Sequence, residues 1–221
     1  MIEPLTQPLA VLVSPLLMPR QGLIPLSRRL RRGGIPTRLF GYPSYRKDIP
    51  ANADRLAQFL RELGDEPFDV VAHSLGGIVL RWAVNHCGAR VPRRVVMIAT
   101  PNQGARLAAT GDRLMGPLFP LVWGRCVRQL RPGADGLCEI AGPLPAECEV
   151  GIIAGGTGTT RGVNPFLRGD NDRIVRVEET KLAGMKDFIL LPMAHGPLIF
   201  RRGGADQVVA FLRNGAFDRD V

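Results

Sequence analysis

Lysine is scarce in this chain of 221 residues, although its formal net charge is +9. The only lysines are Lys47, Lys181 and Lys186, so arginine carries nearly all of the positive charge. A charge of this size is compatible with attraction to nucleic acid, anionic lipid or acidic substrates. The arginines are scattered in pairs such as Arg28-Arg29, and aromatic residues, only 6% of the chain, are not interleaved with them. We therefore expect no nucleic-acid binding and interpret the charge as a compositional bias.

Cysteine is also rare, and none of the four cysteines forms a C-x-x-C pair. This excludes the common zinc and thioredoxin spacings, and we expect neither a metal nor a cofactor. The first four residues lack the basic region of a signal peptide, and the apolar run at residues 9–13 is too short for one. No run approaches the length of a membrane span. These absences predict a cytoplasmic protein with free thiols, whose oligomeric state the sequence leaves open.

Short apolar runs alternate with helical patterns along most of the chain. The runs predict buried strands at residues 9–13, 37–40, 68–71, 94–99, 150–154 and 187–191. Between them, apolar residues at spacings of three and four predict amphipathic helices, and residues 207–212 predict a closing helix. This alternation is typical of right-handed βαβ units. We expect one α/β domain over residues 1–221, with about six mostly parallel strands and helices on both faces.

The stretch Ala72–Gly77 (Ala-His-Ser-Leu-Gly-Gly) lies between a predicted strand and a predicted helix. Strand, sharp turn with serine at its apex, and helix are the context of a nucleophile elbow, G-x-S-x-G. Small neighbours let the strand and helix approach closely, and Ala72 in place of the first glycine adds only one methyl group. The pattern predicts Ser74 as a nucleophile. The N–H of Leu75, at the start of the helix, would stabilise an oxyanion.

Two later segments supply the other members of a catalytic triad. Asp170 and Asp172 lie in a loop after a strand, and an apolar pair two residues beyond Asp172 favours it as the acid. Of the three histidines, His195 alone follows a strand end after the acid, which makes it the expected base. The order Ser74, Asp172, His195 is that of α/β-hydrolases. Calcium-ligand spacing is absent around Asp170.

The loop after the first strand, residues 14–17, is where a second oxyanion donor is expected. Pro15 has no N–H, whereas Leu16 and Leu17 do. We predict Leu16 as the donor and Leu17 as a substrate contact. Tyr42 follows the second strand at the same sheet edge, and either substrate contact or half-buried packing suits it.

Residues 104–146 break the strand–helix rhythm and include an apolar piece at 114–123. This insertion follows a strand's carboxyl end, so we expect it over the active-site edge. It is either a small cap or lid, whose apolar face contacts an acyl chain or a lipid surface, or a pair of short helices that complete the core. Leu118, Phe119 and Trp123 are the predicted substrate contacts in it.

Residues 155–162 are rich in glycine and superficially similar to a phosphate-binding loop. Arg161 stands where the last glycine of G-x-G-x-x-G is required, and no Lys-Ser/Thr pair follows. A flexible loop is therefore the interpretation for this segment.

The chain resembles the small bacterial lipases and carboxylesterases of the α/β-hydrolase superfamily. The resemblance rests on residues 72–77, 99–104, 172–175 and 195–198 and extends over residues 9–211. It implies a minimal α/β-hydrolase fold and the cleavage of small-molecule or lipid carboxylic esters through an acyl-enzyme. Two departures from the family pattern are Ser14-Pro15, where His-Gly is usual, and Arg173, where glycine usually follows the acid.

The triad alone is compatible with several activities. A thioesterase, lactonase or acyltransferase would use the same residues as an esterase. A binding protein with an inactive triad is the alternative from another class, because Pro15 would permit distorted oxyanion geometry.

Overall fold

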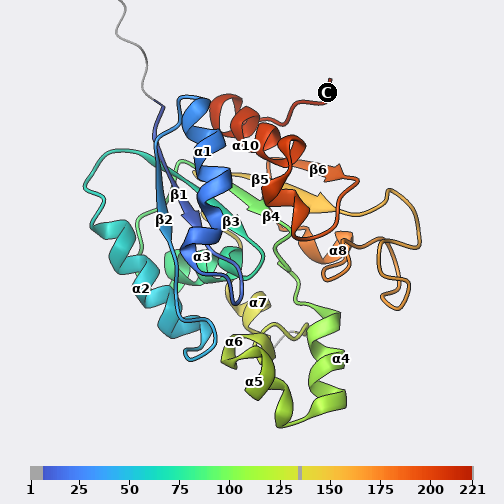
Figure 1. Cartoon of the computed structure of the whole chain (residues 1–221). Helices are drawn as coiled ribbons and strands as arrows, with labels where there is room; N and C mark the ends of the chain where they lie inside the picture. The colour runs from blue at the N-terminus through green and yellow to red at the C-terminus, as the bar shows by residue number, and fades with distance from the viewer. Residues whose placement is uncertain (1–6, 134–135, 221) are drawn as a thin grey trace, which may run out of the picture.

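The computed structural model describes residues 7–133 and 136–220, so the sequence predictions for the first four residues lie outside the described part. Six strands in this part form one sheet in which every neighbouring pair is parallel, in the order β2-β1-β3-β4-β5-β6 (Figure 1). The strands are β1 Leu9–Val13, β2 Thr37–Phe40, β3 Phe68–His73, β4 Arg94–Ile98, β5 Glu149–Gly155 and β6 Asp187–Leu191. The predicted six-stranded parallel sheet is confirmed.

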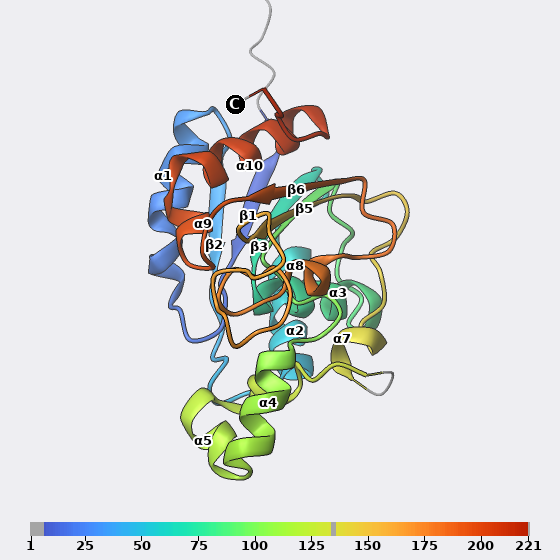
Figure 2. The same cartoon turned by 90° about the vertical axis from the view of Figure 1, so that its right-hand side faces the viewer.

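Helices cover both faces of the sheet (Figures 1 and 2). One face carries α1 and α10, and the other carries α2 and α3, while four short helices, α4 to α7, follow β4. The helices are η1 Arg20–Leu23, α1 Ile24–Arg32, α2 Ile49–Arg61, α3 Leu75–His86, α4 Arg106–Met115, α5 Leu118–Trp123, α6 Arg125–Arg128, α7 Leu137–Ile140, α8 Val177–Thr180, α9 Pro197–Phe200 and α10 Arg202–Asn214.

The continuous apolar runs of the strands result from burial on both faces. In β1, Val11 and Val13 pack towards α2 and α3, whereas Ala10 and Leu12 pack towards α1 and α10. All four are fully buried. Because successive side chains point to opposite faces, a strand between two helical layers needs an apolar residue at every position.

The closing helix begins earlier than predicted, at Arg202 rather than Gln207. Gly203 and Gly204 argue against helix in the sequence, since glycine is a poor helix former. In the structure, a side chain at Gly204 would collide with the carbonyl group of Leu198 in α9. The close approach of α9 and α10 therefore requires glycine there, which helix propensity does not reveal.

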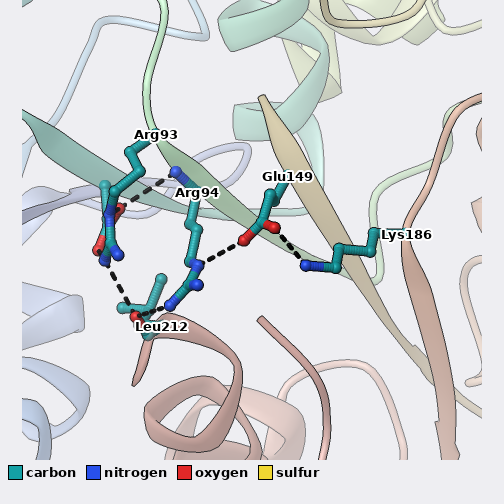
Figure 3. A network of polar contacts seen from close by, with 6 residues as sticks. Arg93, Arg94, Glu149, Lys186 and Leu212 are labelled. Atoms are coloured by element: carbon teal, nitrogen blue, oxygen red, sulfur yellow. Dashed lines mark hydrogen bonds and ion pairs between the residues drawn. The ribbon is translucent and has the colours of Figure 1, made fainter. Parts of the chain in front are cut away.

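A charged network lies at the amino ends of β3, β4 and β5 (Figure 3). Arg93 forms a bidentate pair with buried Asp69, at 3.0 and 2.7 Å. Arg94 donates to Glu149 at 2.6 Å, and Lys186 pairs with the other oxygen of Glu149. Both arginines also donate to the Leu212 carbonyl, at 3.0 and 2.9 Å. Leu212 lies in the last turn of α10, where a carbonyl has no hydrogen-bond partner within the helix, and the two arginines supply the missing donors.

We expect the substitution Glu149→Gln to lower the free energy of unfolding by up to about 1 kcal/mol at neutral pH, as for other partly exposed pairs. Hydrogen bonds from Lys186 and Arg94 hold the pKa of Glu149 below its usual 4.5. Its stabilisation is therefore present above pH 4.5 and is lost as the pH falls through the lowered pKa. Urea unfolding of both proteins from pH 7 to pH 3 measures this difference.

The matched control is Glu147→Gln, which removes the same charge from an exposed side chain with no ion pair among the described residues. A loss of stability equal to that of Glu149→Gln, or one that persists at pH 3, would contradict the role of the ion pairs.

Candidate active site

Ser74 stands at the sharp turn between β3 and α3 with φ 53° and ψ −123°. Such a conformation costs a residue other than glycine about 1–3 kcal/mol and persists only where the surroundings impose it. The N–H of Ser74 donates to the Ile98 carbonyl of β4 at 2.8 Å, which extends the sheet pairing into the turn. The geometry is that of a nucleophile elbow, with the side chain at the carboxyl edge of the sheet.

The two glycines after Leu75 are required by close packing around this turn. A Cβ atom at Gly76 would lie 2.8 Å from the Ser14 carbonyl oxygen, and one at Gly77 would collide with the Thr100 side chain. Ser14 follows β1 and Thr100 follows β4, and these two strands lie on either side of β3 in the sheet. Only glycine lets α3 start this close to the sheet, which explains the double glycine in the sequence.

Asp172 and His195 are in direct contact. Asp172 Oδ2 lies 2.7 Å from His195 Nδ1, and Asp172 Oδ1 accepts from the N–H groups of Ile174 and Val175 at 2.9 and 2.8 Å. The His195 N–H also donates to the Asp172 carbonyl at 2.9 Å. An ionised carboxylate only accepts, so Nδ1 is the donor of this hydrogen bond; in the neutral imidazole Nε2 then has an unshared electron pair.

His73 brings this pair next to the elbow. Its ring centroid lies 4.9 Å from that of His195, and His73 directly precedes Ser74. Burial and the neighbouring His195 lower the pKa of His73 well below its usual value, so its ring is neutral at pH 7. Ser74 Oγ makes no hydrogen bond to another described residue. No sequence pattern indicates this packing role of His73.

Gly155, the last residue of β5, brings the acid and histidine loops together. A Cβ atom there would lie 2.5 Å from the Met193 carbonyl oxygen and 2.8 Å from Asp172 Cβ. The absence of a side chain lets both loops close over the strand end. This role of Gly155 was not predicted, because Gly155 is the first residue of the glycine-rich segment 155–162, which was interpreted as a flexible loop.

Asp170 contacts the first turn of the loop of residues 155–162, and the flexibility of this loop stays a prediction. The Asp170 carboxylate accepts from the N–H groups of Thr157 and Gly158 at 2.8 and 2.9 Å, and from its neighbour Asn171 at 2.9 Å. A carboxylate of the chain therefore occupies amides that would hold a phosphate in a phosphate-binding loop. Asp170 and Asp172 have separate tasks: one organises a loop, and the other pairs with His195.

Arg173 has a φ of 95°, in the region that favours glycine. It follows Asp172 at the position where the lipase pattern usually has glycine. Its N–H donates to Asn171 Oδ1 at 3.0 Å, and its carbonyl accepts from Asn164 at 3.2 Å, so the loop imposes the conformation. Arg173 therefore adopts a conformation that favours glycine, at the cost of backbone strain.

We expect Arg173→Gly to raise the free energy of unfolding by up to about 1 kcal/mol, because the strain of a side chain at positive φ disappears. Arg168→Gly is the matched control, since Arg168 is an exposed arginine of the same loop without a positive φ. That control is expected to lose stability, as glycine adds entropy to the unfolded chain. Thermal unfolding measures the stability of both variants. An equal loss of stability at positions 173 and 168 would contradict the proposed strain at Arg173.

The loop after β1 leaves one of its two leucine amides available. The Leu17 N–H donates to Ser44 Oγ at 2.9 Å, and Leu17 itself has a φ of 56° with an exposed side chain. The Leu16 N–H has no hydrogen-bond partner among the described residues. The Leu75 N–H belongs to the first turn of α3, whose amides lack partners within the helix.

The predicted substrate contacts differ in exposure. Leu17, Leu118 and Trp123 are exposed. Tyr42 is half-buried, its ring stacks on Phe40, and its hydroxyl is buried, which matches the packing alternative. Phe119 is only 5% exposed, because it packs on Gly111 and fixes α5 against α4. Whether any of these side chains contacts a substrate stays a prediction.

The insertion after β4 is tied to the main domain at several points. Arg81 of α3 is buried and donates to the carbonyls of Cys138 and Gly142 at 2.8 and 2.6 Å. Buried Glu179 of α8 accepts from the Arg106 N–H at 3.0 Å and caps α4 from another part of the chain. Residues 134 and 135 of the insertion lie outside the described part. Neither Arg81 nor Glu179 was identified from the sequence.

The four cysteines are free thiols, and burial raises the pKa of each to about 12, so none is a reactive thiolate at neutral pH. Within residues 7–133 and 136–220, no three His, Cys, Asp or Glu side chains form a group able to hold a metal ion. No helix in the same ranges is long and apolar enough to span a membrane.

The model of a domain of unknown function, DUF7379, matches residues 40–118, which include the elbow. The search of curated proteins gives no significant match. The chain is similar in structure to lipase BlEst2 of Bacillus licheniformis in its mature form, with a TM-score of 0.73 and 19% identity over 95% of this chain and 92% of that one.

Phospholipase PlaB of Legionella pneumophila gives a TM-score of 0.72 and 17% identity over 95% of this chain and 60% of that one. The metagenomic carboxyl esterase MGS0156 gives 0.61 and 16%, over 87% and 65%. The chain thus spans less than two thirds of these two proteins. The likenesses show that it has the α/β-hydrolase fold, as its resemblance to that superfamily implied.

Proposed function

We propose that the chain is a serine hydrolase that cleaves carboxylic esters through a covalent acyl-enzyme. The observation that carries the proposal is the Asp172–His195 pair, 2.7 Å apart and packed beside a serine in a strained elbow. A strained serine beside a histidine with an available Nε2 supports nucleophilic catalysis. The α/β-hydrolase fold supports it as well, by analogy.

In the proposed reaction, Ser74 Oγ attacks the ester carbonyl carbon while His195 Nε2 accepts the hydroxyl proton. The Asp172 carboxylate holds the imidazole in the required tautomer and stabilises the imidazolium. The tetrahedral oxyanion accepts from the Leu75 and Leu16 N–H groups, each worth about 3 kcal/mol if similar to other such donors. His195 returns the proton to the leaving alcohol, and a water molecule then releases the acid by the reverse steps.

For the substrate, we propose an ester with an apolar acyl group. The insertion of residues 104–146 acts as a cap, and its exposed residues Leu118 and Trp123, with Leu17 of the first loop, are the proposed contacts. Leu17 lies in the loop after β1, and Leu118 and Trp123 lie in α5 of the insertion after β4. Both segments leave the carboxyl edge of the sheet, where open α/β sheets bind ligands.

A fluorophosphonate probe tests the nucleophile, and p-nitrophenyl esters from acetyl to palmitoyl test the substrate. We expect the probe to label Ser74, identified by mass spectrometry of the labelled peptide, and the esters to be hydrolysed. Faster cleavage of an acyl thioester or a lactone would move the assignment to a thioesterase or lactonase. No labelling together with no hydrolysis would overturn the proposal and favour a binding protein with this fold.

A further inference from the structure

Helices α4 and α5 lie at the end of the molecule away from α1 and α10 (Figures 1 and 2), and they carry several exposed apolar side chains. Leu114 is 80% exposed, Leu121 64% and Leu118 61%. Val122 and Trp123 at the end of α5 are also about half exposed. Large apolar side chains this close in sequence and this exposed are typical of a surface that binds a partner. We call these five residues, together with Arg46 and Arg125, the α4–α6 face.

The segment that carries most of the α4–α6 face is rich in positive charge. Residues 104–133 contain five arginines and a single carboxylate, Asp112. Asp112 is buried and neutralised within the molecule by Arg128 at 2.7 Å and Arg131 at 3.2 Å. No carboxylate in the described part of the chain pairs with Arg46 or Arg125. The surface around the apolar residues is therefore cationic.

A cavity of about 500 Å³ is lined by both cationic and apolar side chains of this region. Arg46, Arg125 and Arg128 line it together with Leu121, Pro120 and Tyr45. Tyr45 fixes the wall, because its hydroxyl donates to the Leu121 carbonyl and its own carbonyl accepts from the Arg125 N–H at 3.1 Å. A ligand with an anionic group and a neighbouring apolar part fits such a lining, since it can contact guanidinium groups and leucine side chains at once.

We propose that the α4–α6 face docks on an anionic phospholipid surface. The lipid phosphates bind Arg46 and Arg125, and the leucines, Val122 and Trp123 enter the boundary between headgroups and acyl chains. Tryptophan suits that boundary because its ring is apolar and its N–H is polar. Self-association through this face would bring the unpaired arginines of two copies together, and this repulsion opposes a dimer.

Docking does not depend on the proposed hydrolysis, so we test it with the Ser74→Ala variant of the full chain, which leaves the lipid intact. Sedimentation compares vesicles of phosphatidylcholine alone with vesicles that also contain phosphatidylglycerol. We expect strong binding only to the anionic vesicles, with a steep decrease as salt is added. In a Trp82→Phe background, brominated lipid should quench Trp123 fluorescence.

The double substitution Arg46→Gln/Arg125→Gln should weaken binding to anionic vesicles about 25-fold, at about fivefold for each arginine. Its control, Arg28→Gln/Arg38→Gln, removes the same charge from exposed arginines of α1 and β2. Val122→Ser should weaken binding about fivefold. Val91→Ser, at an exposed valine before β4, should not.

Three results would overturn the proposal. Equal binding to neutral and anionic vesicles would exclude recognition of the phosphate charge. An equal loss in the Arg28/Arg38 control would indicate attraction by the overall charge rather than by this face. A dimer without lipid that Val122→Ser dissociates would make the face an interface between two copies of the chain.

Discussion

Replacing Ser74 by alanine is expected to lower kcat for a p-nitrophenyl ester by at least about 10⁴-fold. The reason is that Oγ forms the covalent bond to the acyl group, and no other group is positioned to take its place. Alanine also removes a hydroxyl that makes no hydrogen bond to a described residue, so we expect the fold to remain. Steady-state kinetics and thermal unfolding of the same preparation separate the two effects.

Ser14→Ala is the matched control, because Ser14 is a second serine that follows a strand at the same edge of the sheet. Its buried hydroxyl has no hydrogen-bond partner among the described side chains. We expect this variant to keep kcat within about tenfold, since only packing is altered. Activity that survives Ser74→Ala but disappears in Ser14→Ala would refute the assignment of the nucleophile.

Replacing Asp172 by asparagine is expected to lower kcat by about 10³–10⁴-fold while KM changes little. Asparagine offers His195 Nδ1 either an amide N–H or a neutral oxygen, so the tautomer and the imidazolium lose their stabilisation. The side chain is fully buried, and its Oδ1 accepts two backbone N–H groups, so some loss of stability accompanies the change. We expect kcat of the Asp172→Asn variant to rise with pH, because hydroxide partly replaces the lost base, and kinetics measured over a pH series test this.

Asp170→Asn is the control for that experiment, since it makes the same change two residues away. Asp170 accepts from the amides of the glycine-rich loop and does not contact His195. We expect a moderate loss of stability, with kcat reduced by less than about tenfold. If Asp170→Asn inactivates the protein while Asp172→Asn does not, the choice between the two carboxylates is wrong.

Sequence and structure agree best where the signal is local. Each buried strand is a short apolar run, and the predicted runs differ from β1 to β6 by two residues or fewer at either end. Ser74 was identified because an elbow needs small residues within a few positions of the serine. The three candidate triad residues were assigned from their positions along the chain relative to the predicted strands. This assignment needed no knowledge of the tertiary structure.

Other features depend on contacts between distant segments. From the sequence, both Leu16 and Leu17 have an N–H that could serve, and we predicted Leu16 as the donor; in the structure Ser44, which is 27 positions away, accepts from the Leu17 N–H. Phe119 was predicted as a substrate contact, and Tyr42 either as a contact or as half-buried packing; Phe119 is buried against Gly111, and Tyr42 is half-buried against Phe40. In each case, the partner lies on another element, and no periodicity along the chain reports it.

The sequence by itself determined the parallel sheet, the position of the elbow and the chemical types of the three candidate catalytic residues, because these follow from hydrophobic period and turn chemistry. Only the tertiary structure decided that Asp172 contacts His195 while Asp170 binds a loop. It also decided which side chains of the insertion are buried and which form the α4–α6 face. These outcomes depend on how closely separate loops approach at the sheet edge, and packing in three dimensions sets that approach.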